Sequence, residues 1–299
     1  MCVHIKLLIS TVLIFLFFSI FSFSVLPQSL DKAKHIQYLI EKSESNWGAI
    51  AKPAREELKS LGPGDEYALP YLKKALKSKD PGTRCVAALA IQRIEPTNTE
   101  GFDFLINELK NQTGTDYYPG DALVELGARS IPYLVSAIPD DRMHITRAGI
   151  GPVRSAWDTR ALAIRALAKI GPSAVPALIE ALRSNDPRMR LGAANILGMI
   201  GLEAKDAIPA LIAAINDGNA AVRLNVYGAL ASTGKGNPKA RSALIKARNK
   251  WFWRVFYTRE FIPMFVDHLG EPEYKEIQRA IDELDGIDRF KRIKPNDNK

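Results

Sequence analysis

Apolar residues recur along the chain at positions i, i+3, i+4 and i+7 within octets of similar sequence. The five octets that align begin at Leu69, Phe102, Ile131, Val175 and Ile208. This spacing places the apolar side chains on one face of a helix. Proline is the second residue in four of the five octets, and a first helical turn does not need its missing N–H. The pattern therefore predicts short amphipathic helices that each begin within a residue of their proline.

A second motif follows the octets, and it is rich in alanine and leucine. Its four clear copies are residues 79–94, 158–171, 185–201 and 218–234. Asp80 and Asp186 each precede a proline, which predicts an N-cap followed by the first helical residue. Glycines that close these helices are expected in the left-handed conformation; they are Gly127, Gly171, Gly201 and Gly234. Each repeat unit is thus predicted to be two short antiparallel helices.

A single helix pair of this kind cannot bury its apolar stripe, so successive units must stack. The octets follow one another at intervals of 33, 29, 44 and 33 residues, and the sequence patterns of ankyrin and tetratricopeptide repeats do not occur. The fold class predicted is all-α, an α-solenoid, preceded by an apolar N-terminal segment. An arginine recurs at or near the start of each second helix, as Arg84, Arg160, Arg190 and Arg223. We expect these arginines to bond to helix ends or to acids of the adjacent unit.

The pattern AIPALIxAL…D-P-x-x-R…A-x-x-A-L-x-x-I-G resembles the short HEAT-like repeats first named for phycobilisome-linker-associated lyases. The resemblance covers residues 68–247, with residues 240–247 as a worn sixth copy. It implies an α-α superhelix of the armadillo/HEAT type, in which second helices line the recognition side. Arg165, Lys169 and Asn195 are then candidates for a recognition surface. The same units occur in scaffolds, lyases and DNA-repair proteins, so the resemblance indicates a fold and leaves the function open.

The ends of the chain differ from the repeats. The expected organisation is a signal peptide or membrane anchor over 1–26, an N-terminal helical cap over 30–67, HEAT-like repeats over 68–249, an aromatic C-terminal helical cap over 250–290 and a polar tail over 291–299. Residues 7–26 contain no charge, and their length suits a membrane span, whereas Ser22-Phe23-Ser24 suits signal cleavage. Both alternatives stay open, and both predict that the rest of the chain is exported, either periplasmic or extracellular, or anchored in the membrane.

Composition and charge narrow the chemistry. The chain has 299 residues, a formal net charge of +8 and two cysteines without a CxxC motif, which excludes a disulfide scaffold and a cysteine-type zinc site. No metal-ligand spacing or phosphate-binding motif occurs, so no metal, cofactor or catalytic residue is expected. The charge is too dilute to indicate nucleic acid by itself, and an exported chain rarely meets the genome, so nucleic acid is not the expected partner.

Two departures from the repeat template suggest a site. Between Ile138 and Arg160 an insertion of arginines and aromatics fits either a tolerated surface loop or a binding loop for an acidic or anionic partner. In the preceding unit, Pro119 and Gly120 predict that the second helix begins late, with Asp121 as its N-cap. The shortened helix would leave a notch lined by tyrosines, unless the tyrosines fill it and the insertion covers it. The candidate binding residues are Tyr117, Tyr118, Arg142, His144, Arg147, Arg154, Trp157, Arg165 and Asn195.

These observations favour a non-catalytic scaffold or adaptor that binds a protein or peptide, acidic partners included, outside the cytoplasm. Residues 7–26 would add a membrane contact if they are not cleaved. One alternative is an enzyme of the lyase type, for which His144, Tyr117, Tyr118 and Asp121 are the available acid and base groups. The other is a DNA-binding protein, if the leader is not used for export.

Overall fold

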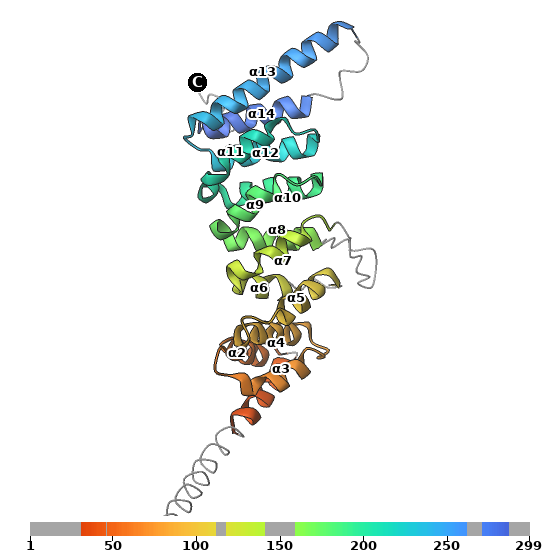
Figure 1. Ribbon diagram of the computed structural model, residues 1–299, viewed down its shortest axis with the longest axis vertical. Helices are drawn as coiled ribbons and strands as arrows, with labels where there is room; N and C mark the ends of the chain where they lie inside the picture. Colours follow the sequence, from red (N-terminus) through yellow and green to blue (C-terminus); the bar gives the residue numbers. More distant parts are fainter. Residues whose placement is uncertain (1–30, 46, 112–117, 141–158, 262–270, 287–299) are drawn as a thin grey trace, which may run out of the picture. The chain divides into compact units, whose positions relative to one another are not determined.

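The computed structural model describes residues 31–45, 47–111, 118–140, 159–261 and 271–286, with the side chains of 251–261, 271 and 272 left out. Every regular element within these ranges is helical (Figure 1). The chain divides into two compact units, Met1–Leu105 and Ile106–Lys299. The apolar segment 7–26 and the insertion that precedes Arg160 lie outside the described residues.

The first unit is built around a helix over 31–43 and the helices that follow it. These are α2 (Gly48–Lys59), η1 (Glu66–Ala68), α3 (Leu69–Ala75) and α4 (Pro81–Ile94), and α5 (Glu100–Asn111) begins in the same unit. Their core contains Ile36, Leu58, Leu72 and Ile91, all fully or almost fully buried. Asp80 caps α4 by accepting a hydrogen bond from the Thr83 backbone N–H, with 2.6 Å between nitrogen and Oδ2, as the sequence predicts.

The second unit is an α-solenoid in which helix pairs stack one after another (Figure 1). Its first-helix layer consists of α7 (Ile131–Ala137), α9 (Val175–Ala181), α11 (Ile208–Ala213) and α13 (Pro238–Phe261). Its second-helix layer consists of α6 (Tyr118–Glu125), α8 (Thr159–Ile170), α10 (Pro187–Ile200), α12 (Ala220–Thr233) and α14 (Glu271–Leu284). Short 3₁₀ segments join them: η2 (Gly127–Ser130), η3 (Gly171–Ala174), η4 (Gly201–Ala207) and η5 (Ala214–Asn216).

The helix starts predicted from the prolines are confirmed. α3, α7, α9 and α11 each carry proline as their second residue. Asp186 caps α10 by accepting from the Arg188 backbone N–H at 2.8 Å. Gly127, Gly171 and Gly201 have φ of 62°, 74° and 69°, the left-handed conformation that ends a helix at little cost only for glycine. Local capping chemistry therefore fixes most of the boundaries of the helix pairs.

One boundary prediction is wrong, and one helix-closing glycine, Gly234, ends its helix as predicted but in another conformation. The helix α6 begins at Tyr118 rather than after Asp121, because Pro119 occupies the first turn, where its missing N–H costs nothing. The helix is still short, with 8 residues against 12 in α8. Gly234 has φ of −95° and is not left-handed. Its requirement for glycine comes from close packing, because a Cβ there would lie 2.5 Å from the Leu230 carbonyl oxygen.

The second helices approach one another closely because their contact faces carry small residues. A Cβ added at Gly198 in α10 would lie 3.2 Å from the Cα of Ala229 in α12. The apolar stripes of the octets are buried between the layers: Leu178 and Leu211 are 0% exposed, as is Leu197 on the second helix α10. This packing leaves the outer faces of both layers as the surfaces on which side chains can meet a partner.

One stretch of the described residues, Thr159–Ala181, has the length and apolar composition of a membrane span. It is not one continuous helix, because Gly171 at φ 74° separates α8 from α9. Half of the apolar 18-residue window within the stretch is also buried inside the protein. Its apolar character is explained by the core of the solenoid.

Candidate functional site

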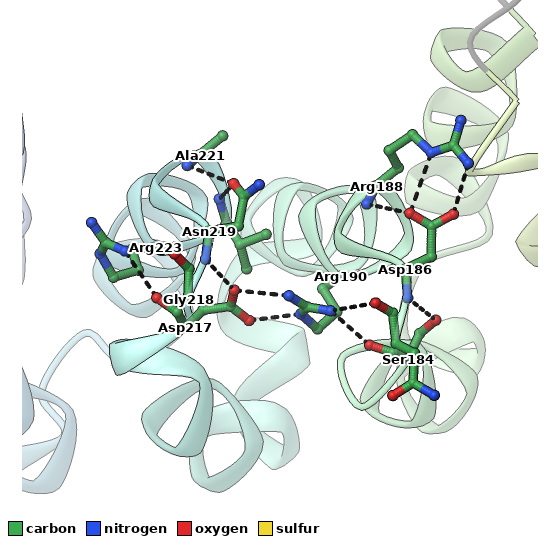
Figure 2. A network of polar contacts seen from close by, with 11 residues as sticks. Ser184, Asp186, Arg188, Arg190, Asp217, Gly218, Asn219, Ala221 and Arg223 are labelled. Carbon is green, nitrogen blue, oxygen red and sulfur yellow. Dashed lines mark hydrogen bonds and ion pairs between the residues drawn. The ribbon is translucent and has the colours of Figure 1, made fainter.

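The repeated arginines hold neighbouring units together at the turns between first and second helices (Figure 2). Arg190 donates from Nε to Asp217 Oδ2 at 2.6 Å and from Nη2 to Asp217 Oδ1 at 2.9 Å. Its Nη1 also donates to the carbonyl oxygens of Ser184 at 2.8 Å and Asn185 at 3.1 Å. One guanidinium therefore closes its own turn and grips the carboxylate of the next unit in a bidentate pair.

Arg223 repeats this arrangement one unit later. Its Nη1 donates to the carbonyl oxygen of Asp217 at 2.9 Å, and its Nε and Nη2 donate to the Glu273 carboxylate in α14 at 2.8 and 2.9 Å. The Tyr227 hydroxyl donates to the same carboxylate at 2.9 Å. Burial, reinforced by this bond to Glu273, raises the pKa of Tyr227 well above its ordinary value. The last repeated arginine thus fastens the C-terminal helix to the stack.

The expectation that these arginines are structural is confirmed where their contacts are described. Arg84 donates to the carbonyl oxygens of Ser78 and Lys79 at 3.0 and 3.2 Å, the same turn-closing contact as in Arg190. Arg190 and Arg223 add an acid of the next element. Part of the positive charge of the chain is therefore neutralised inside the array.

The hydrogen bonds from Arg190 hold the pKa of Asp217 below its ordinary value. A carboxyl group whose pKa is lower in the folded chain stabilises the fold above its unfolded pKa of about 3.9, and this contribution is lost as pH falls through the folded pKa. We therefore expect Asp217→Asn to flatten the acid limb of the stability–pH profile below about pH 4. Thermal denaturation between pH 7 and pH 2.5 measures this limb.

The matched control for that experiment is Asp206→Asn, which removes an exposed carboxylate from η4 of the same unit. Its profile should keep the wild-type acid limb. An unchanged limb in Asp217→Asn would contradict the role assigned to the pair with Arg190.

The outer face of the second helices carries exposed residues on neighbouring helices. Arg165 and Lys169 are exposed on α8, and Asn195 is half-buried on α10. Arg165 and Asn195 occupy equivalent positions, each five residues after a repeated arginine, and α8 contacts α10. Met199 is 54% exposed one turn after Asn195. We name this surface the second-helix face; it places cationic, amide and apolar groups side by side.

The ion pair of Lys169 lies at the edge of the second-helix face. Lys169 Nζ lies 2.8 Å from Asp121 Oδ1 on α6, and both side chains are 54% exposed. An exposed pair of this kind contributes little to stability, so a partner can displace it at small cost. For the lyase alternative, Asp121 is thus held in an ion pair, while His144 and Tyr117 lie outside the described residues.

The structure describes three of the nine candidate binding residues. Arg165 and Asn195 lie on the second-helix face, and Tyr118 is the first residue of α6, with 38% of its surface exposed. The others lie outside the described residues; they are Tyr117, Arg142, His144, Arg147, Arg154 and Trp157. In the part of the chain that the structure describes, no group of three or more His, Cys, Asp or Glu residues could hold a metal ion.

Two grooves on the first-helix layer were not expected from the sequence. One lies between α9 and α11 and has a volume of about 550 Å³. Its lining includes side chains of both charges, namely Arg183, Asp206 and Asp217. The other lies between α11 and α13 and has a volume of about 590 Å³; the charged residues among its described lining are lysines. The lysines recur at helical spacing after Pro238, which is the sequence signal that could have suggested the second groove.

Residues 154–205 match the family model described as HEAT repeats. No curated protein matches the chain in sequence. Among solved structures, human deoxyhypusine hydroxylase in complex with glycerol is 16% identical over 87% of this chain and 99% of that chain, with a TM-score of 0.32. A designed armadillo repeat protein in complex with a (KR)4 peptide is 14% identical over 82% and 98%, with a TM-score of 0.32.

The complex of CpcE and CpcF of phycocyanin lyase from Nostoc is 16% identical over 83% of this chain and 94% of that chain, with a TM-score of 0.30. Likenesses at this level transfer no function to the chain. The family match falls on a second helix, the following octet and the next second helix, which is the repeated pattern found along the sequence. Residues 154–205 therefore carry HEAT repeats.

Proposed function

We propose that the protein is a non-catalytic HEAT-repeat scaffold that binds a protein or peptide on its second-helix face, outside the cytoplasm. The observation that carries this proposal is the division of the cationic side chains. Arg190 and Arg223 are mostly buried and join one unit to the next, whereas Arg165 and Lys169 are exposed on the second-helix face, which also carries Asn195 and Met199.

The composition of this face suits recognition of a protein segment. Arginine is enriched among the residues that dominate binding energy, and methionine adapts its shape to an apolar partner. Small residues keep the helix backbones close together, as at Gly198 and Ala229, so the exposed side chains stand on a rigid support. The positive groups favour partners with carboxylates, in line with the acidic peptide expected from the sequence.

Peptide binding tests the proposal. The full chain, held in nanodiscs of uncharged phosphatidylcholine, is titrated with fluorescent 15-residue peptides whose net charge runs from acidic to basic. We expect saturable binding of acidic peptides that contain apolar residues, and a weakening of about ten-fold in Arg165→Glu/Met199→Glu, equal to about 1.4 kcal/mol.

The control for that titration is Arg183→Glu, an exposed arginine on the first-helix layer that pairs with Glu180. It reverses one charge without touching the second-helix face, and its binding should stay within about two-fold of wild type. Equal weakening by both variants would show a diffuse charge effect and would overturn the assignment to the second-helix face.

Export is the second part of the proposal, supported by the uncharged apolar run over 7–26. In a bacterial host, protease added to spheroplasts should digest a C-terminally tagged chain, while a variant lacking 7–26 should stay protected in the cytosol. Mass spectrometry of the N-terminus then distinguishes cleavage after residue 24 from a retained anchor. A protected full-length chain in the cytosolic fraction would contradict export.

A further inference from the structure

The groove between α11 and α13 is a candidate docking site distinct from the second-helix face, because it lies on the other layer of the solenoid. Its apolar floor is formed by Ile212 and Ile215 from the α11–η5 segment and by Ala243 and Ala247 from α13. Ile212, Ala243 and Ala247 are half-buried. The volume of about 590 Å³ leaves room for several side chains of a partner.

The charged residues in the described lining of this groove are all lysines. Lys239, Lys246 and Lys250 are exposed, and among the residues whose side chains are described no aspartate or glutamate lines the groove with them. Lys250 Nζ reaches across to Asn216 Oδ1 at 3.2 Å, so its ammonium group stays at the groove. The wall is therefore uniformly positive, unlike the neighbouring groove, where Asp206 and Asp217 accompany Arg183.

The two faces of α13 use their basic residues differently. Arg241 forms a bidentate pair with Asp285 just after α14, at 2.6 and 2.9 Å. Arg248 donates to Gln278 Oε1 on α14 at 2.8 Å. The arginines thus join α13 to the rest of the fold, while the lysines stand on the opposite side of the helix at the groove. These arginine contacts fix the orientation of α13 and therefore the side on which the lysine row lies.

The lysines follow one another at intervals of seven and four residues, which is one stripe of a helix. From Lys239 to Lys250 the stripe is about 16 Å long at 1.5 Å per residue. A partner helix lying along this lysine stripe would present carboxylates at the spacing of the lysines. Its apolar side chains would enter the groove. This is the helix-in-groove mode of recognition, in which an amphipathic helix places its apolar face in a hydrophobic groove.

We propose that the groove between α11 and α13 binds an acidic amphipathic helix of a partner protein, whose apolar residues contact Ile212, Ala243 and Ala247 and whose carboxylates pair with Lys239, Lys246 and Lys250. Nucleic acid fits this surface less well, because its phosphates need polar surroundings and have no use for an apolar floor. A membrane fits less well, because the apolar residues line a recess and do not protrude.

The experiment uses the full chain in phosphatidylcholine nanodiscs and three 16-residue helical peptides with the same leucine stripe, flanked by Glu, by Gln or by Lys. Fluorescence anisotropy should give binding of the Glu peptide that is at least about ten-fold tighter than binding of the Gln peptide, and that weakens with added salt. Lys246→Glu should weaken the Glu peptide by about ten-fold and should bind the Lys peptide in its place.

Two further variants separate the groove from the rest of the surface. Ala247→Phe fills the floor without changing charge and should weaken the Glu peptide to a similar degree. Lys205→Glu reverses an exposed lysine of η4 outside the groove and should stay within about two-fold of wild type. Arg165→Glu/Met199→Glu should also keep this binding, which separates failure of the groove from failure of the second-helix face.

Several outcomes would overturn the proposal. Equal weakening by Lys205→Glu and Lys246→Glu would indicate general attraction between charges. No effect of Ala247→Phe would exclude the apolar floor from binding. Tight binding of phosphatidylglycerol vesicles or of an oligonucleotide that depends on Lys246, without preference for the Glu peptide, would assign the lysine row to a membrane or to nucleic acid.

Discussion

Replacing Arg190 by alanine is expected to lower the free energy of unfolding of the second unit by about 2–3 kcal/mol. The substitution removes a bidentate pair with Asp217, whose side chain is 9% exposed, and two hydrogen bonds to backbone carbonyls. It also leaves a nearly buried carboxylate without its main partner. Because each unit of a repeat array contacts only its neighbours, the loss should concentrate where α10 meets α12.

Hydrogen exchange measures this local loss directly. In Arg190→Ala, amides of α10 and α12 should exchange faster, while those of α2 and α4 in the first unit should keep their protection. Urea denaturation followed by circular dichroism gives the overall change. A double-mutant cycle with Asp217→Ala isolates the pair, and the two substitutions together should cost less than their sum.

Arg188 provides a control within the same turn. It pairs with Asp186 two residues away, and its side chain is 51% exposed (Figure 2). An exposed pair within one turn contributes little to stability, so Arg188→Ala should change protection little. Equal effects of the two substitutions, or zero coupling between Arg190 and Asp217, would contradict the view that the repeated arginines fix one unit on the next.

The repeating helix pairs could be predicted because their signals are local. An octet carries its own apolar period and its own proline, and Asp186 caps a helix through contacts within three residues. The role of Arg190 was also predictable in kind, since an arginine that recurs once per unit must meet the same surroundings each time. The identity of the residue that pairs with Arg190 was not predictable, because Asp217 lies 27 residues away in the sequence.

The start of α6 was predicted wrongly although the relevant rule was at hand. Pro119 inside a helix would be a barrier, but as the second residue of α6 it takes the same place as the prolines of four octet helices. Pro119 and Gly120 are both buried, so the interpretation that holds depends on tertiary packing, which the local sequence does not reveal.

Of the two candidate surfaces, one could be predicted from the sequence and the other could not. Arg165 and Asn195 could be placed on one face because the repeat sets their register. The groove beside α13 could not be predicted from the sequence. It depends on the distance between α13 and α11 and on which neighbouring helix the arginines of α13 contact. Arg241 and Arg248 turn toward α14 through partners 44 and 30 residues away, beyond the reach of any local pattern.

Replacing Gly234 by alanine is expected to destabilise the C-terminal end of the array by about 2–3 kcal/mol, the cost of an added methyl group in a packed site. The new Cβ would lie 2.5 Å from the Leu230 carbonyl oxygen and 2.7 Å from the Cβ of Ala240, and 3.4 Å from Leu284. These contacts belong to α12, α13 and α14, so the three helices would have to separate slightly.

For Gly228 in the same helix we expect the opposite effect of alanine, a gain in stability. A Cβ there meets nothing within 4 Å, and the residue lies in the middle of α12. Alanine at this position should therefore stabilise the helix by about 0.5–1 kcal/mol, the difference in helix propensity. Thermal denaturation of both variants, with hydrogen exchange on α12 and α14, checks the pair. Stabilisation by Gly234→Ala would show that α12, α13 and α14 do not meet closely at Gly234, and would remove the close-packing reason for glycine there.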